Sequence, residues 1–300
     1  MAYQSRLSML LTIGLFAANI ITSNTTLAND HPAATVDLQS DCWFFCYTIP
    51  RLGDALEEIG DSQNQSLQPG SFSTLIWNIY KAGKSGFAKD FTQIAKNADL
   101  TLIQEAVLNE KTKKPISPLL NRAWYFAKSF LYESDSLSTG VMTGSKAATT
   151  ESIALRSPDR EPFSNTPKMA LVTTYPIEGQ TDELMIVNFH GINFNPKIYG
   201  ALMSQLKTTE KIVKSHNGPV VFAGDFNTWS ADRKYLVDQF MRDAELSPVH
   251  FVSDRRNQRL DHVYYRNLKV KKSKILDDIQ SSDHWPLIVE FGLDLGDARE

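Results

Sequence analysis

The stretch "PVVFAGDFNTWS" (219–230) carries the strongest signal for both fold and site. Apolar and small residues run along a predicted buried strand and end in Asp225, Phe226 and Asn227. Side chains two positions apart on an extended chain point the same way, so Asp225 and Asn227 face one side and Phe226 faces the other. An acid and an amide are poor core residues. They therefore either cap a turn or perform chemistry.

Similar apolar runs recur along the chain, and helical stretches separate some of them. The other predicted strands cover 73–79, 100–106, 138–145, 169–177, 183–189, 260–270 and 284–291. The predicted helices cover 88–98, 116–130, 196–216 and 231–245. This is too high a ratio of strands to helices for a strict βαβ series. We therefore predict sheet packed on sheet with helices outside, a layered α/β sandwich.

The first 28 residues have the layout of a secretory signal peptide. Arg6 precedes a mostly apolar run, and small residues up to Ala28 offer a cleavage site. We expect cleavage after Ala28 and export to the periplasm or the medium, with an uncleaved anchor as the alternative. Asn19 interrupts the run and it is short, which disfavours a full membrane span.

Residues 29–70 are predicted to form an N-terminal extension and linker, followed by one domain at 71–293 and a tail at 294–300. Both cysteines, Cys42 and Cys46, lie in the extension. In an exported chain such a close pair indicates a local disulfide, and a reduced pair is the alternative. No nearby His or Cys completes a zinc site with them.

The formal net charge of −3 gives no global electrostatic argument for a nucleic-acid-binding protein. It leaves open an enzyme that meets phosphates only in a metal-bearing cleft. This charge therefore excludes binding through a broad basic surface, but not hydrolysis of a phosphate ester.

Polar residues stand at the ends of the predicted strands. They are Asn78, Glu105, His190, Asp225, Asn227, Asp261, Asp283 and His284. Any one of them alone has a structural explanation, because Asn, Asp and His often bond loop amides at strand ends. Together they supply carboxylates, amides and imidazoles without a cysteine. Such a set suits a hard divalent cation such as Mg²⁺.

Six segments carry a resemblance to a known family. "IWNIYK", "LIQEA", "NFH", "GDFN", "LDHVYY" and "SDHWPLIVEF" occur in an order and spacing that resemble the endonuclease/exonuclease/phosphatase superfamily, closest to its bacterial YafD-like branch. The resemblance covers roughly residues 72–292. It implies a four-layered α/β sandwich with two packed mixed β-sheets flanked by helices, and it implies hydrolysis of phosphate esters.

The resemblance also implies a metal site. Glu105 matches the carboxylate that binds the catalytic ion, Asn78 stands beside it in the shell of the metal, and Asp283 matches an acid near the metal. Mg²⁺ is the expected ion, with Mn²⁺ and Ca²⁺ as alternatives.

The remaining matches are catalytic. Asp225 matches the residue that orients and deprotonates the attacking water, and Asn227 the amide that holds a phosphate oxygen. His284 matches the imidazole against the scissile phosphate, oriented by Asp261, and His190 matches a second active-site imidazole.

Three more residues are candidates for substrate binding. Lys81, on the loop after "WNI", can reach a phosphate, and an exposed loop lysine is the alternative. Asn193 and Lys168 complete the set, although Asn193 also suits a loop-stabilising role.

Three functions compete. An exported metal-dependent nuclease is favoured, because its requirements are the least specialised. A phosphatase or a sphingomyelinase-type phospholipase is the alternative, with a phosphorylated small molecule or a phospholipid head group as substrate. A non-catalytic binding module is least favoured, since every position that the chemistry needs is filled. No stable protein partner is implied, and we expect a monomer.

Overall fold

The computed structural model describes the larger part of the 300-residue chain. The described residues are 46–62, 64–108, 116, 122–133, 137–193 and 200–294. The predicted signal peptide, Cys42 and residues 295–300 lie outside them. Within the described part, none of the helices combines the length and the apolar character needed to cross a membrane.

One sheet has eight strands. Across the sheet they follow the order β1 (Tyr47–Thr48), β5 (Ala123–Tyr132), β6 (Leu137–Ser145), β4 (Leu100–Leu108), β3 (Phe72–Asn78), β14 (Leu287–Leu293) and β13 (Leu268–Ile275), and β2 (Leu56–Ile59) also pairs with β5. β3 and β4 are parallel, and the other pairs are antiparallel.

The second sheet has six strands. Their order is β11 (Ser247–Pro248), β12 (Asp261–Arg266), β10 (Val220–Asp225), β9 (Leu184–His190), β8 (Met169–Tyr175) and β7 (Glu151–Arg156). β9 and β10 are parallel, and the remaining neighbours are antiparallel. Both sheets are therefore mixed.

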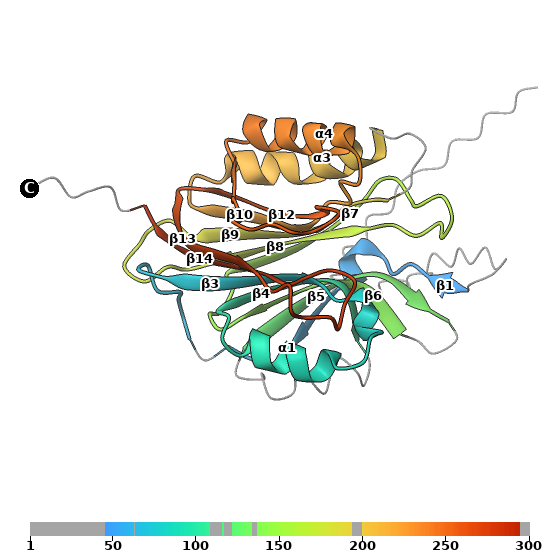
Figure 1. Ribbon diagram of the computed structural model, residues 1–300, viewed down its shortest axis with the longest axis horizontal. Helices are drawn as coiled ribbons and strands as arrows, with labels where there is room; N and C mark the ends of the chain where they lie inside the picture. Colours follow the sequence, from blue (N-terminus) through green and yellow to red (C-terminus); the bar gives the residue numbers. More distant parts are fainter. Residues whose placement is uncertain are drawn as a thin grey trace, which may run out of the picture. The chain divides into compact units, whose positions relative to one another are not determined.

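Helices cover the outer face of each sheet (Figure 1). α1 (Phe87–Ala95) packs on the eight-stranded sheet, and α3 (Gly200–Ser215) and α4 (Ala231–Asp243) pack on the six-stranded sheet. Along β10, Val220 and Phe222 join the core under α3 and α4, whereas Val221 joins the core between the sheets. Burial on both faces explains the continuous apolar run that precedes Asp225. The predicted four-layered sandwich is confirmed.

The predicted helix at 116–130 is wrong from residue 123 onwards, because Ala123–Tyr132 form β5; Ile116 is helical, and residues 117–121 lie outside the described part. Ala123, Tyr125 and Ala127 belong to one buried cluster, while Trp124 and Phe126 belong to the cluster under α1. This alternation has the period of a strand, and aromatic side chains favour strands that are buried on both faces.

The predicted single strand at 260–270 is two strands in two different sheets. Asn267 takes a left-handed conformation, with φ of 55°, and joins β12 of the six-stranded sheet to β13 of the eight-stranded sheet. Asn tolerates this region better than most residues. The last strand begins at Leu287 and not at residue 284.

The predicted extension is structurally joined to the domain where it is described. β1 and β2 both pair with β5, and Leu67 forms a bridge with Ile177. Residues 46–70 thus contribute to the eight-stranded sheet, which the sequence analysis did not predict. Cys46 belongs to a disulfide, and its predicted partner Cys42 lies outside the described residues.

Candidate active site

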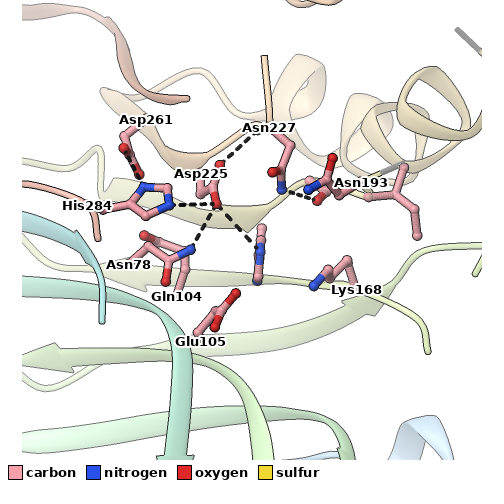
Figure 2. Close-up of polar contacts among 12 residues, drawn as sticks. Asn78, Gln104, Glu105, Lys168, Asn193, Asp225, Asn227, Asp261 and His284 are labelled. Atoms are coloured by element: carbon pink, nitrogen blue, oxygen red, sulfur yellow. Dashed lines mark hydrogen bonds and ion pairs between the residues drawn. The ribbon is translucent and has the colours of Figure 1, made fainter. Parts of the chain in front are cut away.

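Three of the predicted site residues lie side by side at the ends of three adjacent strands of the six-stranded sheet. The register of β9, β10 and β12 places His190 opposite Asp225, and Asp225 opposite Asp261. All three are buried. Adjacent strands bring these side chains together without a shift in the register of the ladder. Figure 2 shows Asp225 and Asp261 with the ring of His284 between them.

His284 reaches these three side chains from the segment before β14. Its Nδ1 lies 2.8 Å from Asp261 Oδ2, and its Nε2 lies 3.9 Å from Asp225 Oδ2. The indole N–H of Trp77 donates to the carbonyl of His284 at 3.0 Å and holds the segment in place. Burial opposes the charge on this imidazole, but the carboxylates of Asp261, Asp225 and Asp283 raise the pKa of His284 to about 10.

Asp225 receives two hydrogen bonds that fix its carboxylate. Asn78 Nδ2 donates to Oδ2 at 2.9 Å, and the backbone N–H of Asn227 donates to Oδ1 at 2.8 Å. Burial raises the pKa of Asp225 to about 6, although the charge of His284 acts in the opposite direction. A carboxylate with this pKa can both hold and release a proton near neutral pH.

The two imidazoles of the site differ in charge. His190 Nε2 lies 3.7 Å from Asp225 Oδ2. Burial, assisted by the positive charges of Lys168, Lys81 and His284, holds the pKa of His190 well below its ordinary value. His190 is therefore neutral where His284 is positively charged.

The turn after β10 depends on Gly224 and Asn227. A Cβ on Gly224, whose φ is 142°, would lie 2.0 Å from the carbonyl oxygen of Phe189, so only glycine lets β10 pass so close to β9. Asn227 takes a left-handed φ of 52°, and its Nδ2 donates to the carbonyl of Gly191 at 2.9 Å. The same nitrogen carries a second hydrogen, which the predicted contact to a phosphate oxygen requires.

Glu105 reaches the site in a different way from the one expected. It does not end a strand, because β4 continues to Leu108. The pairing of β4 with β6 shifts between Ile103 and Ala106, and Glu105 has a left-handed φ of 51°. Such a bulge re-aims a side chain in the middle of a strand.

A second bulge faces the first across β6. The pairing of β5 with β6 shifts between Lys128 and Phe130, opposite Gly140. A Cβ on Gly140 would lie 2.0 Å from the carbonyl oxygen of Ala127. Glycine is thus required at the point where both neighbours of β6 are bulged.

Asn188, which the sequence analysis did not identify, ties the Glu105 bulge to the other sheet. Its Nδ2 donates to the carbonyls of Met142 (3.0 Å) and Ile103 (3.3 Å), and its Oδ1 accepts from Gln104 Nε2 at 2.7 Å. Asn188 is fully buried on β9, two residues before His190. A lone amide inside the apolar run "LMIVNF" is the signal that marks it.

The loop after β3 places a cation beside Glu105. Asn78 Oδ1 accepts from the backbone of Tyr80 at 3.1 Å, and Tyr80, Lys81 and Ala82 all have left-handed φ values of 48–54°. Lys81 Nζ then lies 2.9 Å from Glu105 Oε2. Burial opposes the charge on Glu105, but Lys81 and Lys168 keep the pKa of its carboxyl below the ordinary value.

Most of the predicted residues line one cavity of about 570 Å³. Its predicted members are Asn78, Lys81, Glu105, Lys168, His190, Asn193, Asp225, Asn227, Asp283 and His284. Asp261 lies behind His284 and borders the neighbouring cavity. Asn193 also has the loop-stabilising role that was the alternative to substrate binding, because its Oδ1 accepts a hydrogen bond from the indole N–H of Trp229 at 3.0 Å.

The donors of this cavity fit a hard divalent cation. Among the described lining residues, four carboxylates (Glu105, Glu161, Asp225 and Asp283) outnumber three cationic side chains. Asp261 Oδ1 is buried without a hydrogen-bond partner in the described part of the chain. Ligand atoms of Asp225, Asp261 and His284 also lie within 4.8 Å of one another. The bond from His284 to Asp261 explains that cluster, so the oxygen donors of Glu105, Asn78 and Asp283 suit the metal better.

Solved structures share this fold. The human Nocturnin catalytic domain with bound sulfate has 16% sequence identity and a TM-score of 0.59, over 79% of this chain and 97% of that one. A mannosyl-6-phosphatase from Bacteroides thetaiotaomicron has 15% identity and a TM-score of 0.56, over 73% of this chain and 99% of that one. At this identity the likeness concerns the fold alone.

Sequence similarity identifies the family. The chain belongs to the Endonuclease/Exonuclease/phosphatase family, whose model matches residues 75–284. It is also 32% identical over 265 residues to a UPF0294 protein of Vibrio campbellii, with 82% of this chain and 91% of the relative covered. Members of the family hydrolyse phosphoester bonds and depend on divalent metal ions.

Proposed function

We propose that the protein is a Mg²⁺-dependent phosphodiesterase that attacks the phosphorus atom with water, and that its substrate is nucleic acid. The observation that carries the proposal is the setting of Asp225. Its carboxylate is buried, is held by hydrogen bonds from Asn78 and the Asn227 backbone, and lies within 4 Å of both site imidazoles. A structural carboxylate has no need of this arrangement.

The side chains have separate tasks in the proposed reaction. Asp225 accepts the proton of the attacking water, because its pKa of about 6 leaves it ionised at neutral pH. His284, kept protonated by Asp261, donates from Nε2 towards the negative phosphate, and the Asn227 amide binds another phosphate oxygen. General acid–base assistance of this kind contributes about 10²–10⁴-fold to a rate.

The oxygen donors of Glu105, Asn78 and Asp283 would hold the cation. When bound, it would neutralise charge on the phosphate oxygens. Two further side chains of the cavity would face the substrate. They are Lys81, which lies beside Glu105, and neutral His190, which lies beside Asp225.

We also propose that the enzyme acts outside the cytoplasm. The proposal rests on the signal-peptide layout of residues 1–28 and on the disulfide of Cys46, since disulfides persist in oxidising compartments. Fractionation of cells that express the full chain tests it, and activity confined to the cytoplasm would contradict it.

The function is tested by a substrate panel with the purified full chain. We expect nicking of plasmid DNA with Mg²⁺, none with EDTA, and a loss of about 10³-fold in Asp225→Asn. The variant keeps the size of the side chain, but its amide nitrogen cannot accept one of the two hydrogen bonds that Asp225 receives. Its melting temperature is therefore measured as well, to separate a loss of activity from a loss of folded protein. Mn²⁺ and Ca²⁺ are included as alternative ions.

The panel separates the levels of the proposal. Intact DNA and RNA together with hydrolysis of inositol phosphates or release of phosphocholine would exclude the nuclease and keep the phosphoesterase. Failure to hydrolyse any phosphate ester with any of the three metals would overturn the phosphoesterase itself.

A further inference from the structure

The active-site cavity continues into a smaller cavity of about 120 Å³. Lys81, Glu105, Glu161, Lys168 and His190 line both. The smaller cavity lies against β5, β6 and β8 and against the loop that joins β7 to β8. Its remaining polar walls are the side chains of Ser129, Tyr132, Thr139, Ser164 and Thr166.

Two lysines bring positive charge to the junction of the cavities. Lys168 Nζ lies 3.2 Å from a Glu161 oxygen, and Lys81 Nζ lies 2.9 Å from Glu105 Oε2. The side chain of Lys168 is only 15% exposed. An ammonium group shielded from water attracts an anion more strongly than one on an open surface.

Each lysine can turn from its glutamate towards a ligand, because the glutamate keeps other partners. Glu161 also accepts hydrogen bonds from the backbone of Asn193 at 3.2 Å and from the hydroxyl of Ser164 at 3.2 Å. Glu105 is the proposed metal ligand, so its charge is shared. A phosphate that approaches Lys168 therefore leaves no unpaired carboxylate behind.

The size of the smaller cavity limits what it can bind. A volume of about 120 Å³ is roughly four times the ~30 Å³ that one water molecule occupies in the liquid. Pockets that enclose whole drug-sized ligands measure about 300–1,000 Å³. The cavity thus admits one small polar group. The hydroxyls of Ser129 and Ser164 already donate to Pro167 O and to Glu161, so the two lysines are the groups that favour an anion with several oxygen acceptors.

We propose that the smaller cavity binds a phosphomonoester group of the substrate, next to the phosphodiester that is cut. Lys168 is its main cation, and Lys81 lies between the two phosphates. This proposal rests on the proposed function and makes it narrower: the substrate carries a phosphomonoester beside the scissile bond. A phosphorylated end of a nucleic-acid strand and a small phosphorylated diester share this chemistry, whereas the interior of a strand offers diesters only.

The test compares dinucleotides that bear a 5′-phosphate, a 3′-phosphate or neither, and oligonucleotides with the same three kinds of end. For one of the phosphorylated forms we expect kcat/KM to be about 10–100-fold higher than for the hydroxyl form, the worth of one or two charge-assisted hydrogen bonds. A preference for a phosphorylated form that is seen with the dinucleotides alone indicates a small-molecule substrate. A preference that is seen with both the dinucleotides and the oligonucleotides indicates strand ends.

Lys168→Met should remove this preference, mainly through KM. Lys168→Gln is made in parallel in case the first variant does not fold. Lys146→Met is the matched control, because Lys146 also pairs with a carboxylate, Asp99 at 2.9 Å, but lies outside both cavities. It should keep the preference of the wild type.

Two results would overturn the subsite: equal kcat/KM for all ends in the wild type, or a preference that persists in both Lys168 variants. If the wild type hydrolyses none of the substrates, the proposed function fails instead. Calorimetry then tests the subsite separately, by measuring how tightly the phosphorylated dinucleotide binds to the wild type and to the two Lys168 variants. Equal binding to all three proteins would contradict the subsite.

Discussion

His190, Asp225 and Asp261 stand in register at the ends of three adjacent strands, whereas Glu105 enters the same cavity from the middle of a strand. The first group is the strand-end half of the site, and Asn78 with Glu105 is the bulge half. The strand-end half needs regular pairing and a glycine at position 224. The other needs a left-handed residue at Glu105, a glycine at position 140 and the buried amide of Asn188.

The difference shows where the protein stores backbone strain. Glu105, Lys81 and Asn227 all have positive φ and all line the cavity. Non-glycine residues in this region cost about 1–3 kcal/mol each, and they persist only where the surrounding structure holds them. The bulge half is therefore the part that depends most on its supporting contacts.

The largest effect on the Mg²⁺ dependence is expected from Glu105→Gln. Outer-shell partners of a metal are worth about 10–100-fold in affinity or activity, and loss of a ligand charge should cost about 100-fold or more at low Mg²⁺. Titration of Mg²⁺ against hydrolysis checks this. Activity should return in part at high Mg²⁺, while Asp225→Asn stays inactive. Equal Mg²⁺ dependence in the two variants would remove the distinction between the halves.

A smaller effect is expected from Asn188→Leu, which takes the donor away from the buried carbonyls of Ile103 and Met142. The free energy of unfolding should fall by about 1–3 kcal/mol, the cost of leaving buried polar groups unsatisfied. Because the bulge loses its support, half-maximal activity should also need more Mg²⁺. Urea unfolding and the same titration measure the two effects.

Gln104→Leu is the matched control for Asn188→Leu. It removes the bond between the two amides and a long bond to the Leu102 carbonyl (3.5 Å), but it leaves the Asn188 bonds to the carbonyls of Ile103 and Met142 in place. It should destabilise less and leave the Mg²⁺ dependence close to that of the wild type. An Asn188→Leu protein that is less stable but has the Mg²⁺ dependence of the wild type would show that the bulge holds without Asn188.

The last effect concerns the pH dependence of stability and arises from His262, which lies behind the strand-end half. Burial, with Lys234 and Arg256, lowers the pKa of His262 to about 3, and its Nε2 lies 2.7 Å from the hydroxyl of Thr228. The unfolded chain, with a pKa near 6.5, binds the proton more readily. Stability should therefore fall as the pH drops from about 6.5 towards 3, by up to about 1.4 kcal/mol per pH unit. In His262→Gln, the free energies of unfolding at pH 7 and pH 5 should differ by less than they do in the wild type. Parallel pH profiles of stability for the two proteins would contradict this.

The strand-end half was accessible from the sequence because its signal is local. Asp225, His190 and Asp261 each adjoin an apolar run, and the sheet register then brings them together. The layered sandwich followed from the high ratio of strands to helices, and its four layers from the family resemblance.

The bulge half was less accessible because its signals are not local. Glu105 looked like a strand end, since nothing in "LTLIQEAVL" announces a bulge opposite Gly140. β5 looked helical, because its alternating contacts with two different cores are visible only when both neighbours are placed. Asn267 looked like the middle of one strand, although its backbone sends the chain into the other sheet.

That crossing at Asn267 gives the sandwich a mechanical asymmetry. β12 carries Asp261 at one end and is followed by Asn267 at the other, so a covalent link joins the two sheets at the edge remote from the cavity. A link of one residue limits how far β12 and β13 can separate at this end, whereas Asp261 of the site lies at the opposite end of β12.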